Sequence, residues 1–225
     1  MKKLIKFWIY SLVIMGLFIL ISNSCKKKDK EENPIETVTI GSQTWMKMNL
    51  DVDRYRNGDI IPQATDQIKW DESNNKGTGC WCYYEYDINY GIKYGKLYNG
   101  YAVLDPRGLA PSGFHIPNDG DWYILIDYLG GKLIAGKKIK STSGWYSGNG
   151  TNESGFSGLP GGYKETYDSF LSDGFLGAWW SLYRNPSSSG LIIFQVLYSS
   201  DEIQTTTYST WAGFSLRCIK DLGSP

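Results

Sequence analysis

Four cysteines and one histidine are the residues of this 225-residue chain whose side chains most readily do chemistry: Cys25, Cys80, Cys82, Cys218 and His115. Cys80 and Cys82 form a Cys-x-Cys pair, but a structural zinc site needs four nitrogen or sulfur ligands. No second pair or histidine cluster accompanies them, and His115 has no evident partner for nucleophilic catalysis. We therefore expect no enzyme, no metal site and no cofactor, with His115 in a structural role at the start of a helix.

Cys25 differs from the other cysteines because it follows a secretion signal. Residues 1–6 carry three lysines, residues 7–21 have no charge, and Ser22-Asn23-Ser24 precedes the cysteine. This layout is typical of a signal peptide, and 22–25 resembles a lipobox, in which the thiol is acylated and the chain is cut before it. The apolar run is short for a spanning helix of about 20 residues. We predict a signal peptide at 1–24, lipidation at Cys25 and a membrane held through several acyl chains.

The residues after Cys25 predict a tether followed by one domain. Residues 25–35 are mostly charged and cannot bury enough apolar surface to fold, so we expect a solvated leash. Residues 36–221 have the length of a single domain, and 222–225 form a tail. Lysines and acids just after the cysteine resemble the export signals of surface lipoproteins in Bacteroidetes-like bacteria. We therefore expect an outer membrane lipoprotein at the cell surface or the periplasmic face.

Charge and composition narrow the class of domain and partner. Removing residues 1–24 takes three of 23 basic side chains and no acid, which leaves 20 against 23 and a net charge of −3. No basic stripe remains for nucleic acid. The remaining chain keeps eight Trp, sixteen Tyr, six Phe and 25 Gly. This mixture favours a loop-rich α+β domain whose large rings fill the core.

The clearest predicted helix begins after Pro117. Asn118 can cap it, and Asp121 stands three places later as in a capping box. The apolar residues at helical spacing that follow are Trp122, Leu125, Ile126 and Leu129. Gly130-Gly131 should end this helix, and a short second helix is expected over Lys132–Ile139.

Strand patterns occur at both ends of the domain. Thr37–Ile40 and Gln43–Met46 flank a glycine turn and predict a hairpin. Asn57-Gly58 predicts a turn, residues 71–79 a polar loop, and residues 141–173 a long loop region, which is often functional. Further strands are expected at 178–182, 191–198, 204–208 and 213–219.

Aromatic rings beside amide and charged groups give the candidate ligand site. The long loop region holds Trp145 and Tyr146 with Asn149 and Asn152. Adjacent strand residues face opposite ways, so one of Trp179 and Trp180 should point outward, with Arg184 nearby. Flat rings with hydrogen-bonding neighbours suit the apolar faces and hydroxyl edges of sugars. We therefore predict that the surface formed by residues 141–190 binds glycan.

A series of sequence blocks in a fixed order gives the chain a family resemblance. They include Gly41-Ser-Gln-Thr-Trp45, Tyr94-Gly-Lys-Leu-Tyr-Asn99, Gly155-Phe-Ser-Gly-Leu-Pro-Gly-Gly162 and Gly213-Phe-Ser-Leu-Arg-Cys218. Together they resemble the Fibrobacter succinogenes major paralogous domain over about residues 38–221. The Pro-x-x-x-x-Trp helix start and the closing Gly-Phe-x-x-Arg strand also resemble C-type-lectin-like domains and formylglycine-generating enzymes.

The resemblance implies an α+β, C-type-lectin-like fold with paired N- and C-terminal strands, one main helix and a long loop region. It also implies a disulfide between Cys82 and Cys218, since both lie in family blocks. A Cys80–Cys218 bond and three free thiols are the alternatives. Family members often carry cysteine where this chain has Ala110 and tryptophan where it has Phe114.

Taken together, these features predict a lipid-anchored cell-envelope protein with a non-catalytic binding domain for polysaccharide or another glycan. The alternative is a structural or adhesive surface protein that binds another envelope protein.

Overall fold

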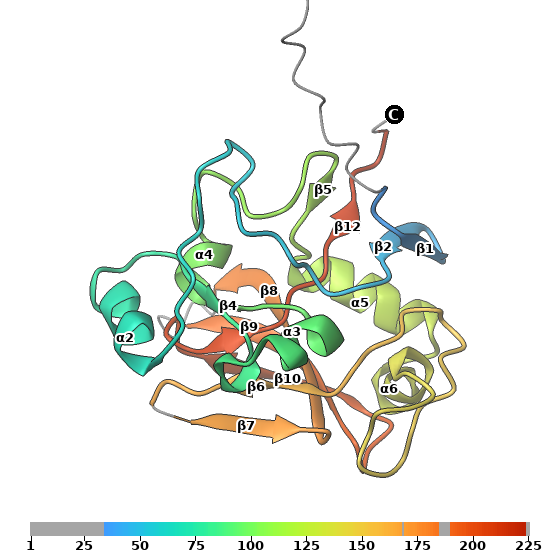
Figure 1. The fold of residues 1–225 in the computed structure, drawn as a ribbon. Helices are drawn as coiled ribbons and strands as arrows, with labels where there is room; N and C mark the ends of the chain where they lie inside the picture. The colour runs from blue at the N-terminus through green and yellow to red at the C-terminus, as the bar shows by residue number, and fades with distance from the viewer. Residues whose placement is uncertain (1–33, 168, 185–189, 224–225) are drawn as a thin grey trace, which may run out of the picture. The chain divides into compact units, whose positions relative to one another are not determined.

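A computed structural model describes residues 34–167, 169–184 and 190–223, except for the side chain of Arg184. Within the compact unit Ile35–Pro225, these residues form twelve strands in three antiparallel sheets, with short helices between them (Figure 1). The protein is therefore a mixed α/β domain. None of the described helices combines the length and apolar character needed to cross a membrane.

The first sheet joins the two ends of the domain. Its strands, in spatial order, are β1 (Thr37–Ile40), β2 (Gln43–Met46), β12 (Ile219–Lys220) and β5 (Phe114–His115). The hairpin forms as expected, and Gly41 takes a positive φ of 61° in its turn. We expected the first strand to pair with the last, but β12 pairs with β2 instead, through Ile219 and Trp45. The strand β1 pairs with β2 alone and is therefore an edge strand of this sheet.

The other two sheets form the body of the domain. The second sheet contains β10 (Ile203–Tyr208), β9 (Leu191–Leu197) and β8 (Leu176–Arg184). The third contains β3 (Trp81–Cys82), β4 (Leu97–Asn99), β11 (Gly213–Phe214), β6 (Gly161–Lys164) and β7 (Phe170–Asp173). Two of these, β6 and β7, fall inside the region predicted as a long loop. The predicted last strand is divided into β11 and β12, which lie in different sheets.

The main helix is α5 (Asp119–Tyr128), and it forms as its sequence predicts. Asn118 and Asp121 make both bonds of a capping box, at 3.1 and 3.0 Å. The four apolar residues at helical spacing are all buried. After the helix, Gly130 and Gly131 both take positive φ values, and α6 (Lys132–Ile139) follows.

Three helices have no counterpart in the sequence prediction: α2 (Gln67–Asn75), α3 (Ile88–Tyr94) and α4 (Gly100–Val103). The second half of α2 lies in the region predicted as a polar loop. This helix buries only Trp70 and Asn74, too few apolar side chains to give a helical period. The Asp66 side chain caps it by accepting a bond from the Lys69 amide at 2.9 Å.

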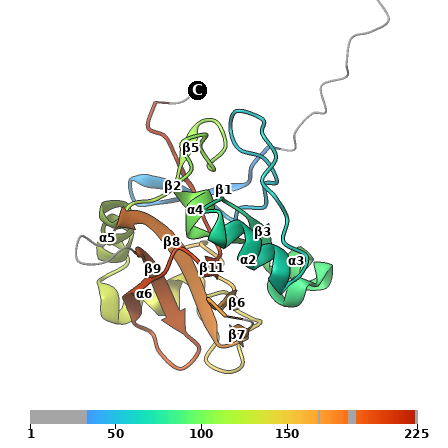
Figure 2. The ribbon, with the colours of Figure 1, turned by 90° about the vertical axis from the view of Figure 1, so that its left-hand side faces the viewer.

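The core lies on both faces of β8. Figure 2 shows β8 and β9 between the α5–α6 pair and the strands β11, β6 and β7. Trp179 packs with Trp122 and Phe156 on the helix side, and Trp180 packs against Phe214 on the other. Both faces of β8 are covered at Trp179 and Trp180, so neither tryptophan reaches solvent.

A buried polar group ties this core to the N-terminal segment. The Asn49 side-chain oxygen accepts bonds from the Trp179 indole at 2.9 Å and from the Arg217 guanidinium at 2.8 Å. The guanidinium also lies 4.1 Å from the centre of the Phe156 ring and donates to the Phe156 carbonyl oxygen. Buried polar groups of this kind are costly to leave unpaired, so Asn49 fixes the orientation of both partners.

Candidate functional site

The structure does not bring the predicted rings together on one surface. Trp145, Trp179 and Trp180 are buried, and the expectation that one of the two strand tryptophans points outward is wrong. Their indole nitrogens donate to Ser141 Oγ, Asn49 Oδ1 and the Tyr98 carbonyl oxygen. A buried indole with its N–H satisfied is a packing residue, so these three rings support the fold and do not contact a ligand.

The two predicted asparagines hold their own loop. Asn149 accepts a bond from the Trp145 amide at 3.2 Å. Asn152, whose φ is 51°, exchanges two bonds with Ser157 at 2.9 and 2.7 Å. Both amides therefore act as turn-forming groups. The side chain of Arg184 lies outside the described residues.

Tyr146 is the predicted ring that does face solvent. Its side chain is 71% exposed and stacks on Phe175, with ring centres 4.6 Å apart. Tyr198 meets both rings edge-on, at 5.8 and 5.2 Å. Tyr146 and Phe175 belong to the predicted region and Tyr198 lies outside it. The side chains of Asn149 and Asn152 bond within their own loop.

The three cysteines among the described residues, Cys80, Cys82 and Cys218, are free thiols in the structure, and the expected Cys82–Cys218 disulfide is not formed there. Cys82 belongs to a small apolar cluster around Trp70, whereas Cys218 belongs to the main core. The two thiols thus point into separate packed regions. Burial raises the pKa of Cys80 and of Cys218 to about 12 and raises that of Cys82 as well, which keeps all three protonated and unreactive.

His115 contacts two carboxylates. Its Nδ1 lies 2.7 Å from Asp221 and its Nε2 lies 3.4 Å from Asp121, the capping-box residue of α5. The ring thus links β5, the first turn of α5 and the C-terminal segment. This arrangement agrees with the structural role expected at the start of the helix. In the described part of the chain, no group of three or more His, Cys, Asp or Glu residues is arranged to hold a metal ion.

A cleft of about 650 Å³ lies between α5 and the outer strand β10, and we take it as the candidate ligand site. Its side and base include the half-exposed ring of Tyr123 and the buried side chains of Ile126 and Ile203. The polar residues that line it are Asp127, Lys132, Gln195, Glu202, Gln204, Thr205 and Thr206. The volume falls in the range of small-ligand sites, and the lining is more polar than is usual for such sites. The cleft can therefore offer a flat ring and hydrogen-bonding groups to the same molecule.

The local fold explains why the ring is fixed. Tyr123 follows the buried Trp122 on α5 and meets the Phe194 ring edge-on at 5.7 Å. Phe194 is itself stacked on Trp122 at 4.9 Å with an angle of 12° between the planes. In the β9–β10 register Thr205 stands opposite Phe194, and Gln204 stands opposite Gln195 one position along. Cross-strand partners lie on the same face and adjacent residues on opposite faces, so Thr205 lies on the face that Tyr123 contacts, whereas the two glutamines lie on the other face.

A comparison with known families identifies the chain. The model of the Fibrobacter succinogenes major domain matches residues 38–220. The chain belongs to this family. The match covers every described strand of this Fibrobacter succinogenes major domain except the first residue of β1. No curated protein and no solved structure matches the chain.

Sequence reasoning missed the residues that line the α5–β10 cleft, although one signal was present. Tyr123 lies on a predicted helix of the Fibrobacter succinogenes major domain but outside its apolar face, which predicts an exposed aromatic ring. The opposite wall could not be found in this way. The residues of β10 alternate only weakly, and the cleft depends on how closely this strand approaches α5.

Proposed function

We propose that this protein is a lipid-anchored cell-envelope protein whose domain binds glycan, without catalysis, in the cleft between α5 and β10. The observation that carries the proposal is the combination of the fixed, half-exposed Tyr123 ring with the side chains of Asp127, Lys132 and Thr205, which line the same cleft. A sugar ring can stack its C–H face on the tyrosine while its hydroxyls bond to these polar side chains. Anchoring rests on Cys25 and the preceding signal sequence.

Two further features of the prediction belong to this proposal. We propose an outer membrane location, at the cell surface or the periplasmic face, because charged residues follow the acylated cysteine. We also propose a C-type-lectin-like fold. It is supported by the pairing of β2 with β12 at the ends of the domain and by the amphipathic helix α5.

A second function, adhesion to another envelope protein, is favoured by one specific observation. The exposed cluster of Tyr146, Phe175 and Tyr198 presents stacked rings on the surface. Aromatic anchors of this kind dominate many protein interfaces. The cluster offers few free polar groups for sugar hydroxyls, so a protein partner fits it better.

A glycan array with the lipidated protein in detergent tests both functions. We expect Tyr123→Ala to lose glycan binding and Tyr146→Ala to keep it, since the two exposed rings are matched in type and lie at different sites. Loss in the Tyr146→Ala protein alone would move the site to the ring cluster. Equal binding by both variants and the parent protein would contradict a glycan site at Tyr123. The anchor is tested separately, because Cys25→Ala should remove the acyl label.

A further inference from the structure

The α5–β10 cleft runs along the outer edge of strand β10. Four consecutive residues of the strand line it, namely Ile203, Gln204, Thr205 and Thr206. Successive side chains of a strand point to opposite faces, so the cleft receives side chains from both faces of β10. A cleft on one face would meet every second residue only. The lining therefore includes the edge itself, where a strand projects main-chain N–H and C=O groups.

Main-chain groups on this edge are open to the cleft. β10 is an outer strand of its sheet, and it pairs with β9 in an unbroken register from Ile203–Val196 to Tyr208–Leu191. In an antiparallel pair, every second residue directs both its N–H and its C=O away from the neighbouring strand. In the described part of the chain, no backbone hydrogen bond joins residues 203–206 to a segment other than β9. Two of these four residues thus present an unbonded donor and acceptor.

The other outer strands of the described sheets are short or have their free side occupied. Strands β3 and β5 have two residues each, and β1 and β7 have four each. The long strand β8 donates from the Trp180 and Leu182 amides to carbonyl oxygens outside its sheet. β10 has six residues, without a charge, a proline or a bulge. These are the features that usually protect an open edge, so β10 is suited to pairing with another extended chain.

The walls of the cleft fit the two faces of such a chain. Side chains of a strand laid on β10 would alternate between the α5 side and the opposite side. On the α5 side they meet the half-exposed Tyr123 ring and Ile126. On the opposite side they meet the amides of Gln195 and Gln204. Residues 203–206 span about 13 Å at the usual rise per strand residue, which is the length of a four-residue segment.

We propose that the edge of β10 binds an extended polypeptide segment, which adds a strand to the β10–β9–β8 sheet. Main-chain hydrogen bonds hold the segment, as in other cases of recognition by strand addition. The inference rests on the proposed glycan site for one part alone: a sugar on a side chain that points toward α5 lies against Tyr123. The ligand is therefore a glycosylated polypeptide, bound through its main chain at β10 and through its sugar at Tyr123.

The test uses the full-length protein and three probes. The first is a heptapeptide of alternating threonine and serine, with N-acetylgalactosamine on the central serine. The second is the same peptide without the sugar, and the third is the methyl glycoside of the sugar. The glycopeptide should bind about tenfold or more tighter than either part, because linking makes the second contact intramolecular. Hydrogen exchange measured by NMR should show new protection at the amides of alternate residues within 203–206.

N-methylation of the glycopeptide tests main-chain pairing without altering the protein. Alternate residues of a strand direct their N–H groups toward the same neighbour. Methylation of one alternate set of amides should therefore abolish binding, whereas methylation of the other set should leave it unchanged. The sugar at Tyr123 fixes the register, since a slip of one residue would turn it to the opposite face. Equal effects of the two sets would overturn the proposal.

Matched variants separate the strand from the sugar. Tyr123→Ala should reduce the affinity for the glycopeptide to about that for the bare peptide. The control Tyr167→Ala, at an exposed ring that does not line the cleft, should change neither affinity. A melting temperature for each variant shows whether a loss of binding comes from unfolding.

The three probes also distinguish failure of this inference from failure of the glycan site. If the methyl glycoside binds as tightly as the glycopeptide, the strand site is wrong and the glycan site stands. If the bare peptide binds as tightly as the glycopeptide and protects alternate amides, the strand site stands and the sugar contact at Tyr123 is wrong. Absence of new protection at residues 203–206 with both peptides would overturn the strand site.

Discussion

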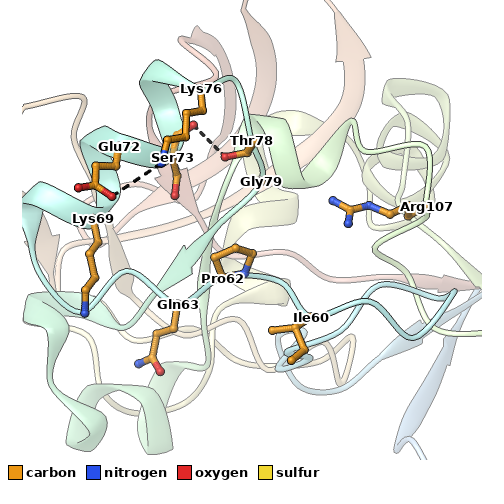
Figure 3. A pocket seen from close by; sticks show the side chains of 10 residues that line it. All are labelled: Ile60, Pro62, Gln63, Lys69, Glu72, Ser73, Lys76, Thr78, Gly79 and Arg107. Atoms are coloured by element: carbon orange, nitrogen blue, oxygen red, sulfur yellow. Dashed lines mark hydrogen bonds and ion pairs between the residues drawn. The ribbon is translucent and has the colours of Figure 1, made fainter.

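The two clefts of this domain rest on different kinds of support. The α5–β10 cleft stands on stacked rings, with Phe194 between Trp122 and Tyr123 above the main core. A second cleft, of about 490 Å³, lies beside α2, and Thr78 and Arg107 are among the residues that line it (Figure 3). This α2 cleft stands on polar contacts: Arg107 bonds to Asp105 and Asp59, and the Asn99 side chain bonds to Asn74 and to the Thr78 carbonyl oxygen. Apolar packing depends little on pH, whereas polar support depends on each donor and acceptor. The two clefts should therefore be disrupted by different substitutions.

The largest effect is expected where the ring support is removed. Phe194 is buried and contacts both Trp122 and Tyr123, so Phe194→Ala should lower the free energy of unfolding by about 3–5 kcal/mol. Urea denaturation measures it. The matched control Tyr123→Ala, at a half-exposed ring, should cost about 1 kcal/mol or less. Similar losses in the two variants would show that the ring stack does not support the cleft.

A smaller loss is expected where the polar support is removed. Asn99 caps α4, accepts bonds from the Cys80 and Ala102 amides, and donates to Asn74 and the Thr78 carbonyl oxygen. Asn99→Ala leaves these buried groups unpaired and should cost about 2–4 kcal/mol.

The same variant should affect the two clefts differently. NMR shifts should change along α2 and at Thr78, which lines the α2 cleft, while the Tyr123 ring signals stay in place. If the signals of both clefts move together, the two supports are coupled, and the distinction between them is wrong.

The smallest effect concerns acid. The Arg107 guanidinium holds the pKa of Asp105 below its usual value, and bonds from Asn57 and then Arg107 lower that of Asp59. A carboxylate whose pKa is lowered by folding stabilises the fold above its unfolded pKa of about 4. That contribution is lost as the pH falls through the lower, folded-state pKa. The Arg107 group should therefore stay intact from neutral pH to about pH 5 and loosen only in stronger acid.

A carboxyl NMR titration measures this directly. The midpoint of Asp105 should lie below the usual aspartate value, and Arg107→Gln should raise it, because the largest cause of the shift is removed. A midpoint that does not respond to the substitution would show that the guanidinium does not hold Asp105.

Much of the fold follows from local sequence rules. The capping box at Asn118 and the four apolar positions of α5 specify that helix without reference to the rest of the chain. The hairpin around Gly41 is equally local. Helix α2 could not be predicted, because it buries one tryptophan and one asparagine and is held by the Trp70 and Asn74 side chains, which bond to the carbonyl oxygen of Trp211. That partner lies more than 130 residues away.

The candidate sites were harder to predict than the fold. The prediction that Trp179 and Trp180 face opposite sides of β8 was correct. Whether either side meets solvent depends on residues from distant parts of the chain, which pack against both faces of the strand. Arg107 owes its fixed position to Asp59, 48 residues earlier. The sequence shows which residues are charged or aromatic. It does not show which segments come together to form the two walls of a cleft, because that depends on the tertiary structure.

The three buried thiols can make unfolding of the domain irreversible. Folding keeps Cys80, Cys82 and Cys218 reduced and out of reach of oxidants, and no cross-link among them contributes to the described fold. Once the chain opens, however, all three thiols recover an ordinary pKa of about 8.5 and can pair in three ways. None of those bonds occurs in the native arrangement, so in an oxidising medium each unfolding event can become a one-way step, and the lifetime of the protein is governed by its rate of opening.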